Sequence, residues 1–214
     1  KLFIVFKYLD VGKVRGDLRF NSTLRGFVEV FSSKTSRTYT IAAGLIFGIL
    51  VSFLNIAQPL FQEFLMVGKS FALYFGLGAL SVGFGAIINA RIVTIINPQK
   101  IVLIALYLTA IWSIFFYSLI FFNLKINVIN VMIFLIPVFF LFGFLFGNMN
   151  ALALTPMGHI AGTASAVIGT TSIIIAIPIG SIIAYYYKGP LDNFVQLIIV
   201  VSLINIFLLS KVKH

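Results

Sequence analysis

The chain contains no cysteine, which excludes disulfides and metal sites built on thiolates. Histidine is nearly as scarce: it occurs only as His159 and His214, and neither has another metal-ligating side chain nearby in the sequence. We therefore expect no metal site and no cofactor, and we expect His159 to be exposed in its turn. The sequence also lacks a Gly-x-x-x-x-Gly-Lys-Ser/Thr phosphate loop and a His-Glu-x-x-His pair, so it predicts no hydrolytic or redox enzyme.

Charged residues are also few, at 9% of the chain, against about 25% in a soluble domain. Hydrophobic residues make up 61% of the sequence, and its mean hydropathy is +1.13. A soluble domain of 214 residues could not cover that much apolar surface, so the composition predicts a protein that crosses the lipid bilayer several times. The formal net charge of +10 would also suit nucleic acid. We expect no nucleic-acid partner, because the basic residues lie between apolar runs, as they do in cytoplasmic loops.

The apolar runs are continuous rather than alternating in polarity, which favours membrane helices over strands. We expect an all-α membrane fold, with a bundle of six transmembrane helices over residues 39–210. The six spans are expected at residues 39–61, 71–90, 101–122, 128–154, 163–187 and 191–210.

The segments that flank the bundle are short and basic. Residues 1–9 read as the end of a preceding transmembrane helix, so we expect the chain to be a fragment of a longer protein. Residues 10–38 read as a cytoplasmic linker, and residues 211–214 as a cytoplasmic tail. Between Ser22 and Ser33 of the linker, apolar residues recur at helical spacing, which predicts an amphipathic helix along the membrane surface.

Basic residues are distributed unevenly between the two sides of the six spans. On one side, six lie in the linker, two in the 91–100 loop and two in the tail. The other side has only Lys69, Lys125 and Lys188. Because cytoplasmic loops collect Lys and Arg, we expect a multi-pass protein of the cell (inner) membrane with its C-terminus in the cytoplasm.

Small residues recur every third or fourth position in several spans, and such residues permit close contact between membrane helices. They are Gly44, Gly48 and Ser52; Ala72, Gly76, Ala79 and Gly83; Gly143, Gly147 and Ala151; and Ser172, Ala176, Gly180 and Ala184. We expect all four series to be helix-packing faces. Pro137 and Pro178 fall inside spans, where they are expected to kink the helices.

Polar side chains inside the spans are the candidates for substrate contact, because they are costly in lipid and face the bundle interior or an aqueous cavity. Asn55 and Gln58 share a helix face and either line a cavity or bridge two helices. Asn148 and Asn150 point in different directions; we expect Asn148 to face the cavity, with bracing of the cytoplasmic gate as the alternative. Thr170, Thr171 and Ser172 either line the path or bond the carbonyls of their own helix.

The stretch from Gly147 to Gly169 joins two spans through a short Pro-Gly-His turn and opens the second span with Ala161-Gly-Thr-Ala-Ser-Ala166. It resembles the loop between the tenth and eleventh helices of Bcr/CflA-type drug:proton antiporters of the major facilitator superfamily. Residues 24–33 are similar to the juxtamembrane helix before the family's seventh span. Residues 74–91 are similar to its eighth helix, and residues 97–100 take the place of its Gly-Pro-Arg-Arg turn.

The resemblance implies the C-terminal half of a major facilitator fold. It implies a multidrug efflux antiporter that exchanges a small-molecule substrate for protons, with the N-terminal half of the same transporter as partner. Asn89 and Arg91 then belong to the loop that locks the cytoplasmic face, with a membrane-anchoring role of Arg91 as the alternative. The family's proton-titrating carboxylate lies in the N-terminal half, and the five carboxylates of this chain fall at span ends or in loops.

Two other functions stay open at this point. One is a dedicated exporter of a single metabolite within the same superfamily. The other is a six-span membrane subunit that transports nothing itself and binds a partner. The residues expected upstream distinguish these possibilities, because a carboxylate in the middle of their first helix would indicate proton coupling.

Overall fold

The computed structural model describes residues 20–189 and 191–212, and every regular element in that part of the chain is a helix. The long helices are α2 (Phe20–Ser32), α3 (Lys34–Gln58), α4 (Phe71–Ile92), α5 (Pro98–Phe121), α6 (Val128–Leu154), α7 (Ala161–Tyr186) and α8 (Asp192–Ser210). The short helices are η1 (Pro59–Phe64), η2 (Gly68–Ser70) and η3 (Thr155–Ile160). The segment expected at residues 1–9 lies outside the described residues.

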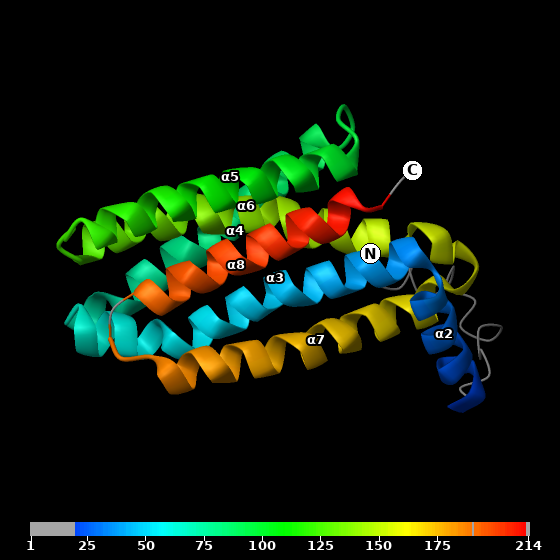
Figure 1. The fold of residues 1–214 in the computed structure, drawn as a ribbon, viewed down its shortest axis with the longest axis horizontal. Coiled ribbons are helices and arrows are strands. Elements are labelled where there is room, and N and C mark those ends of the chain that lie inside the picture. The colour runs from blue at the N-terminus through cyan, green and yellow to red at the C-terminus, as the bar shows by residue number, and fades with distance from the viewer. Residues whose placement is uncertain (1–19, 190, 213–214) are drawn as a thin grey trace, which may run out of the picture.

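Helices α3 to α8 lie side by side along one long axis (Figure 1). Within the described residues, five helical stretches are long and apolar enough to cross a membrane. The stretch Val128–Tyr186 has 59 residues and turns back at η3, so it contains both α6 and α7. The predicted bundle of six apolar helices is therefore confirmed, and it is that of a multi-pass membrane protein.

Most helix ends lie close to their predicted positions, and α6 begins and ends at the predicted residues 128 and 154. The first span, predicted to begin at residue 39, begins earlier, at Lys34. Ser33 caps it, because its side chain accepts a hydrogen bond from the Ser36 amide at 3.3 Å. At the other end of α3, Pro59 has no amide hydrogen to donate, and the chain continues as the π-helix η1.

The contacts between helices follow a repeated pattern. α3 packs along α7, and α4 packs along α6. α5 packs on α6, and α8 packs on α3. α3 also contacts α6, and α5 also contacts α8. If α3, α4 and α5 are matched with α6, α7 and α8 in that order, each of these helix contacts corresponds to a contact in the same set. Because α3 and α6 run in opposite directions (Figure 1), the two three-helix units form an inverted repeat.

α4 and α6 pack closely enough for their backbones to touch at two glycines. A Cβ added to Gly85 would lie 2.0 Å from the carbonyl oxygen of Phe140, and one added to Gly143 would lie 2.4 Å from that of Val82. No larger side chain fits at either position without separating the helices. Ser81 of α4 adds a hydrogen bond across this contact, since its hydroxyl donates to the carbonyl oxygen of Ile136 at 2.6 Å.

The face of α4 predicted to pack is not packed within the described part of the chain. Ala72, Ala79 and Gly83 are exposed, and a Cβ added to Gly76 would meet no described atom within 4 Å. The residues of α4 that are buried belong to another series: Gly78, Ser81, Gly85 and Asn89. On α6 the prediction holds only in part, because Gly143 is packed whereas Gly147 and Ala151 are exposed. Small residues at helical spacing occur on two sides of α4, so spacing alone does not identify the packed side.

The packing faces predicted on α3 and α7 are confirmed for most of their length. A Cβ added to Gly48 would lie 2.8 Å from Ile179, and one added to Gly180 would lie 2.5 Å from Val51. Ser52 and Ala176 are fully buried, while Ala184 near the end of α7 is exposed. Glycine thus allows the backbones of α3 and α7 to approach closely, as expected for membrane helices.

α2 lies crosswise at one end of the bundle, beside the start of α7 (Figure 1). Gly26 of α2 faces the methyl group of Thr163, and the Glu29 carboxylate lies within hydrogen-bonding contact of His159 Nε2 in η3. The His159 side chain is 62% exposed, as its place in a turn predicts. The expected helix between residues 22 and 33 is confirmed, with apolar side chains exposed away from the bundle: Leu24, Phe27 and Val28.

Candidate functional site

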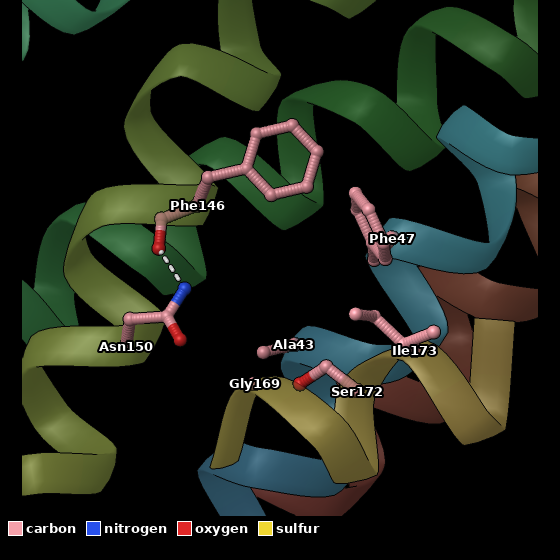
Figure 2. Close-up of a pocket in the computed structure, with 7 residues that line it drawn as sticks. All are labelled: Ala43, Phe47, Phe146, Asn150, Gly169, Ser172 and Ile173. Carbon is pink, nitrogen blue, oxygen red and sulfur yellow. Dashed lines mark hydrogen bonds between the residues drawn. The ribbon is translucent and has the colours of Figure 1, made fainter. Parts of the chain in front are cut away.

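A cavity of 260 Å³ lies between α3, α6 and α7. Its lining residues are Ala43 and Phe47 of α3, Phe146 and Asn150 of α6, and Gly169, Ser172 and Ile173 of α7 (Figure 2). The rings of Phe47 and Phe146 meet edge to face, with centroids 6.3 Å apart. The wall is mainly apolar and aromatic, and Gly169 leaves room where a larger side chain would fill the space.

Two polar side chains interrupt this apolar wall. The Asn150 Nδ2 donates to the carbonyl oxygen of Phe146 at 2.8 Å, which leaves Asn150 Oδ1 free to accept a hydrogen bond. The Ser172 Oγ is buried and has no hydrogen-bond partner among the described residues. Figure 2 shows both side chains directed into the space between α6 and α7. A ligand in this cavity would therefore find acceptors for its own N–H or O–H groups and one hydroxyl donor.

Asn55 and Gln58 lie on the exposed side of α3, outside the cavity. Asn55 is eight residues after Phe47, which places it about 12 Å further along the helix. Neither amide makes a hydrogen bond to another described residue. Asn55 Nδ2 lies over Gly180 of α7, 3.1 Å from where a Cβ would be. Within the described part of the chain, the two amides therefore do not bridge helices.

Asn148 and Asn150 occupy positions opposite to those expected. Asn148 is 3% exposed, and its Nδ2 donates to Asn89 Oδ1 at 2.8 Å and to the carbonyl oxygen of Phe144 at 2.9 Å. This amide pair joins α6 to α4, so Asn148 braces the helix end, and Asn150 is the amide that lines the cavity. The expectation for Asn148 is corrected because the side of α6 that carries it is covered by α4.

Thr171 and Arg91 take no part in the polar contacts described above. Thr171 is half-buried and does not line the cavity, whereas the next residue, Ser172, does. Arg91 is exposed at the end of α4, and its guanidinium has no hydrogen bond or ion pair within the described part of the chain. Of the pair expected at the cytoplasmic loop, Asn89 is thus held in a contact between helices and Arg91 is not.

No feature of the sequence identified the aromatic residues that line the cavity. Phe47 and Phe146 sit in helices that are apolar on every side, so a phenylalanine facing a cavity has the same sequence surroundings as one facing lipid. Only the polar members, Asn150 and Ser172, carried a recognisable signal, since polar groups inside a membrane span are unusual.

No protein-family model matches this chain, and neither the curated proteins nor the solved structures include a significant match to it.

Proposed function

We propose that this chain is one six-helix half of a secondary active transporter of the major facilitator type, which exports amphipathic small molecules in exchange for protons. The observation that carries the proposal is the inverted repeat that relates α3, α4 and α5 to α6, α7 and α8. Each half of a major facilitator transporter is built from two such inverted three-helix repeats.

The exposed apolar side chains of α4 and α7 support the proposal that a second half of the transporter packs against this chain. Leu80 of α4 is 70% exposed and Ile174 of α7 is 64% exposed, and small residues such as Gly83 lie beside them. A second helix bundle packed on this surface would bury apolar area and approach closely at the small residues. The cavity between α3, α6 and α7 would then lie inside the complete transporter.

The cavity chemistry supports an amphipathic substrate that carries an amine. The faces of Phe47 and Phe146 bind apolar groups and also attract cations. Asn150 Oδ1 accepts a hydrogen bond from an ammonium or amide N–H, and Ser172 Oγ adds a second polar contact. So few polar groups on a broad apolar wall favour compounds selected by shape and desolvation.

Proton coupling needs a titratable group within the membrane. The carboxylates among the described residues are Glu29 in α2, Glu63 in η1 and Asp192 at the first residue of α8, all of them away from the middle of a span. We therefore assign the proton-carrying group to the other half of the transporter, and the binding of substrate to both halves.

Efflux of a fluorescent aromatic cation from cells that express the full-length transporter tests the proposal. Efflux should stop when a protonophore collapses the proton gradient. Phe146→Ala should weaken efflux of the dye roughly two- to tenfold, because one aromatic contact is lost. Phe121→Ala is the matched control: Phe121 is 74% exposed at the end of α5 and does not line the cavity, so its removal should leave efflux unchanged. Efflux that persists without the gradient, or that responds equally to both variants, would contradict the proposal.

A further inference from the structure

A second concave site lies at the end of the bundle opposite α2. It is a groove of 460 Å³ between η1 and the end of α7, and it shares no lining residue with the cavity described above. Phe64 and Tyr187 supply its aromatic part. Its shape is well defined, since the Tyr187 hydroxyl donates to the carbonyl oxygen of Gly189 at 2.7 Å, and the Phe64 ring lies on Gly189. Gly189 has a φ of +103°, a backbone conformation that glycine tolerates best.

The groove carries two opposite charges that are not paired with each other. Glu63 and Lys188 both line it, and neither has an ion-pair or hydrogen-bond partner within residues 20–189 and 191–212. Glu63 likewise forms no ion pair with Lys69. Burial raises the pKa of the Tyr187 phenol, and the nearby Glu63 carboxylate raises it further. Tyr187 therefore stays neutral, and the groove presents one carboxylate and one ammonium.

A simple cation in this groove would be attracted by Glu63 and repelled by Lys188. A simple anion would be attracted by Lys188 and repelled by Glu63. A ligand that carries both an ammonium and an anionic group can contact both charges at once. Such charge-assisted contacts are stronger than neutral ones. The groove lies where the helices of a membrane bundle end, which is the depth of the lipid headgroups, and amphipathic rings such as that of Tyr187 are favoured there.

We propose that this groove binds the headgroup of a zwitterionic phospholipid, with the lipid ammonium at Glu63 and the lipid phosphate at Lys188. A phosphoethanolamine headgroup fits best, because its ammonium has N–H groups to donate to the carboxylate, whereas a trimethylated choline headgroup has none. The site is independent of the proposed transport function, since it requires only that the bundle crosses a bilayer.

Thermal unfolding of the full chain in lipid nanodiscs tests the assignment, with the fluorescence of Trp112, the only tryptophan, as the signal. Trp112 reports on the bundle because its Nε1 donates to the carbonyl oxygen of Phe134 between α5 and α6. In discs of phosphatidylcholine, added phosphatidylethanolamine should raise the unfolding temperature in a saturable manner. Glu63→Gln and Lys188→Gln should each weaken this response about tenfold or more, while the exposed Lys69→Gln at the same end should not.

The charge-swapped chain, Glu63→Lys with Lys188→Glu, should recover part of the preference, because a dipolar headgroup can bind in the reverse direction. Recovery would exclude a purely structural effect of the single substitutions. Free phosphoethanolamine added to phosphatidylcholine discs separates the two sources: a response to it without any lipid preference would assign the groove to a soluble zwitterion and overturn the lipid assignment. Equal stabilisation by both lipids, or a preference that survives Glu63→Gln, would overturn the site itself.

Discussion

The contact between Asn89 and Asn148 shows how a single polar residue acts within the apolar bundle. Each amide lies inside a membrane helix, where an unpaired polar group is unfavourable, and each finds its partner on the neighbouring helix. Asn150, two residues later, bonds only to its own helix and leaves an oxygen directed into the cavity. The same residue type thus has a bracing role at one position and a binding role at the other.

Replacing these asparagines separately distinguishes the two roles. Asn148→Leu should destabilise the folded chain by about 0.5–2 kcal/mol, because it leaves Asn89 without its partner. Asn150→Leu should leave stability nearly unchanged and should alter the relative efflux of different compounds instead. Unfolding in mixed detergent measures the first effect, and efflux normalised to membrane abundance measures the second. Equal losses of stability in both variants would contradict the assignment.

At the scale of the element, α4 presents two different faces to its surroundings. One face meets α6 so closely that the backbone carbonyl of Phe140 occupies the place where Gly85 would carry a Cβ. The other face, with Gly76 and Gly83, is open. The open face contains small residues as well, and in the proposed transporter it is part of the surface available to the second half.

Alanine substitutions on the two faces of α4 should have unequal effects. Gly85→Ala should destabilise the chain by at least about 1–3 kcal/mol, since the added methyl group overpacks the contact with α6. Gly76→Ala meets open space, so the stability of the chain should stay the same or rise slightly. Thermal unfolding of the two variants in the same detergent measures the difference. A similar loss at Gly76 would mean that this face is packed after all.

At the scale of the whole molecule, the two ends of the bundle differ in charge. The end where α2 is docked carries six described cations, namely Arg25, Lys34, Arg37, Arg91, Lys100 and Lys211. The other end carries three, namely Lys69, Lys125 and Lys188. By the positive-inside rule, we expect the α2 end to lie in the cytoplasm. The contact of Glu29 with His159 would then hold α2 against the bundle on the cytoplasmic side.

Cysteine labelling in intact cells tests this orientation without background, because the native chain contains no cysteine. Single cysteines at Lys69, Lys125 and Lys188 should react with a membrane-impermeant reagent from outside. Cysteines at Arg25 and Lys100 should react only after the membrane is opened. The reverse labelling pattern would place the C-terminus outside.

The sequence by itself determined the helices and their approximate ends. Length and hydropathy specify a membrane span without reference to any neighbour, because every backbone hydrogen bond of the span is made within it. For that reason α6 begins and ends as predicted. The one large difference is at Lys34, where a polar turn capped by Ser33 extends α3 into residues assigned to the linker.

The faces of those helices were decided only by the tertiary structure. In a soluble helix, the polar side marks the surface and the apolar side marks the core. The spans of this chain are apolar all round, so lipid-facing and buried positions have the same composition, and the packed Gly85 cannot be told from the open Gly83. The pairing of α4 with α6 buries Asn148 and leaves Asn150 at the cavity, and no local feature of the sequence specifies that pairing.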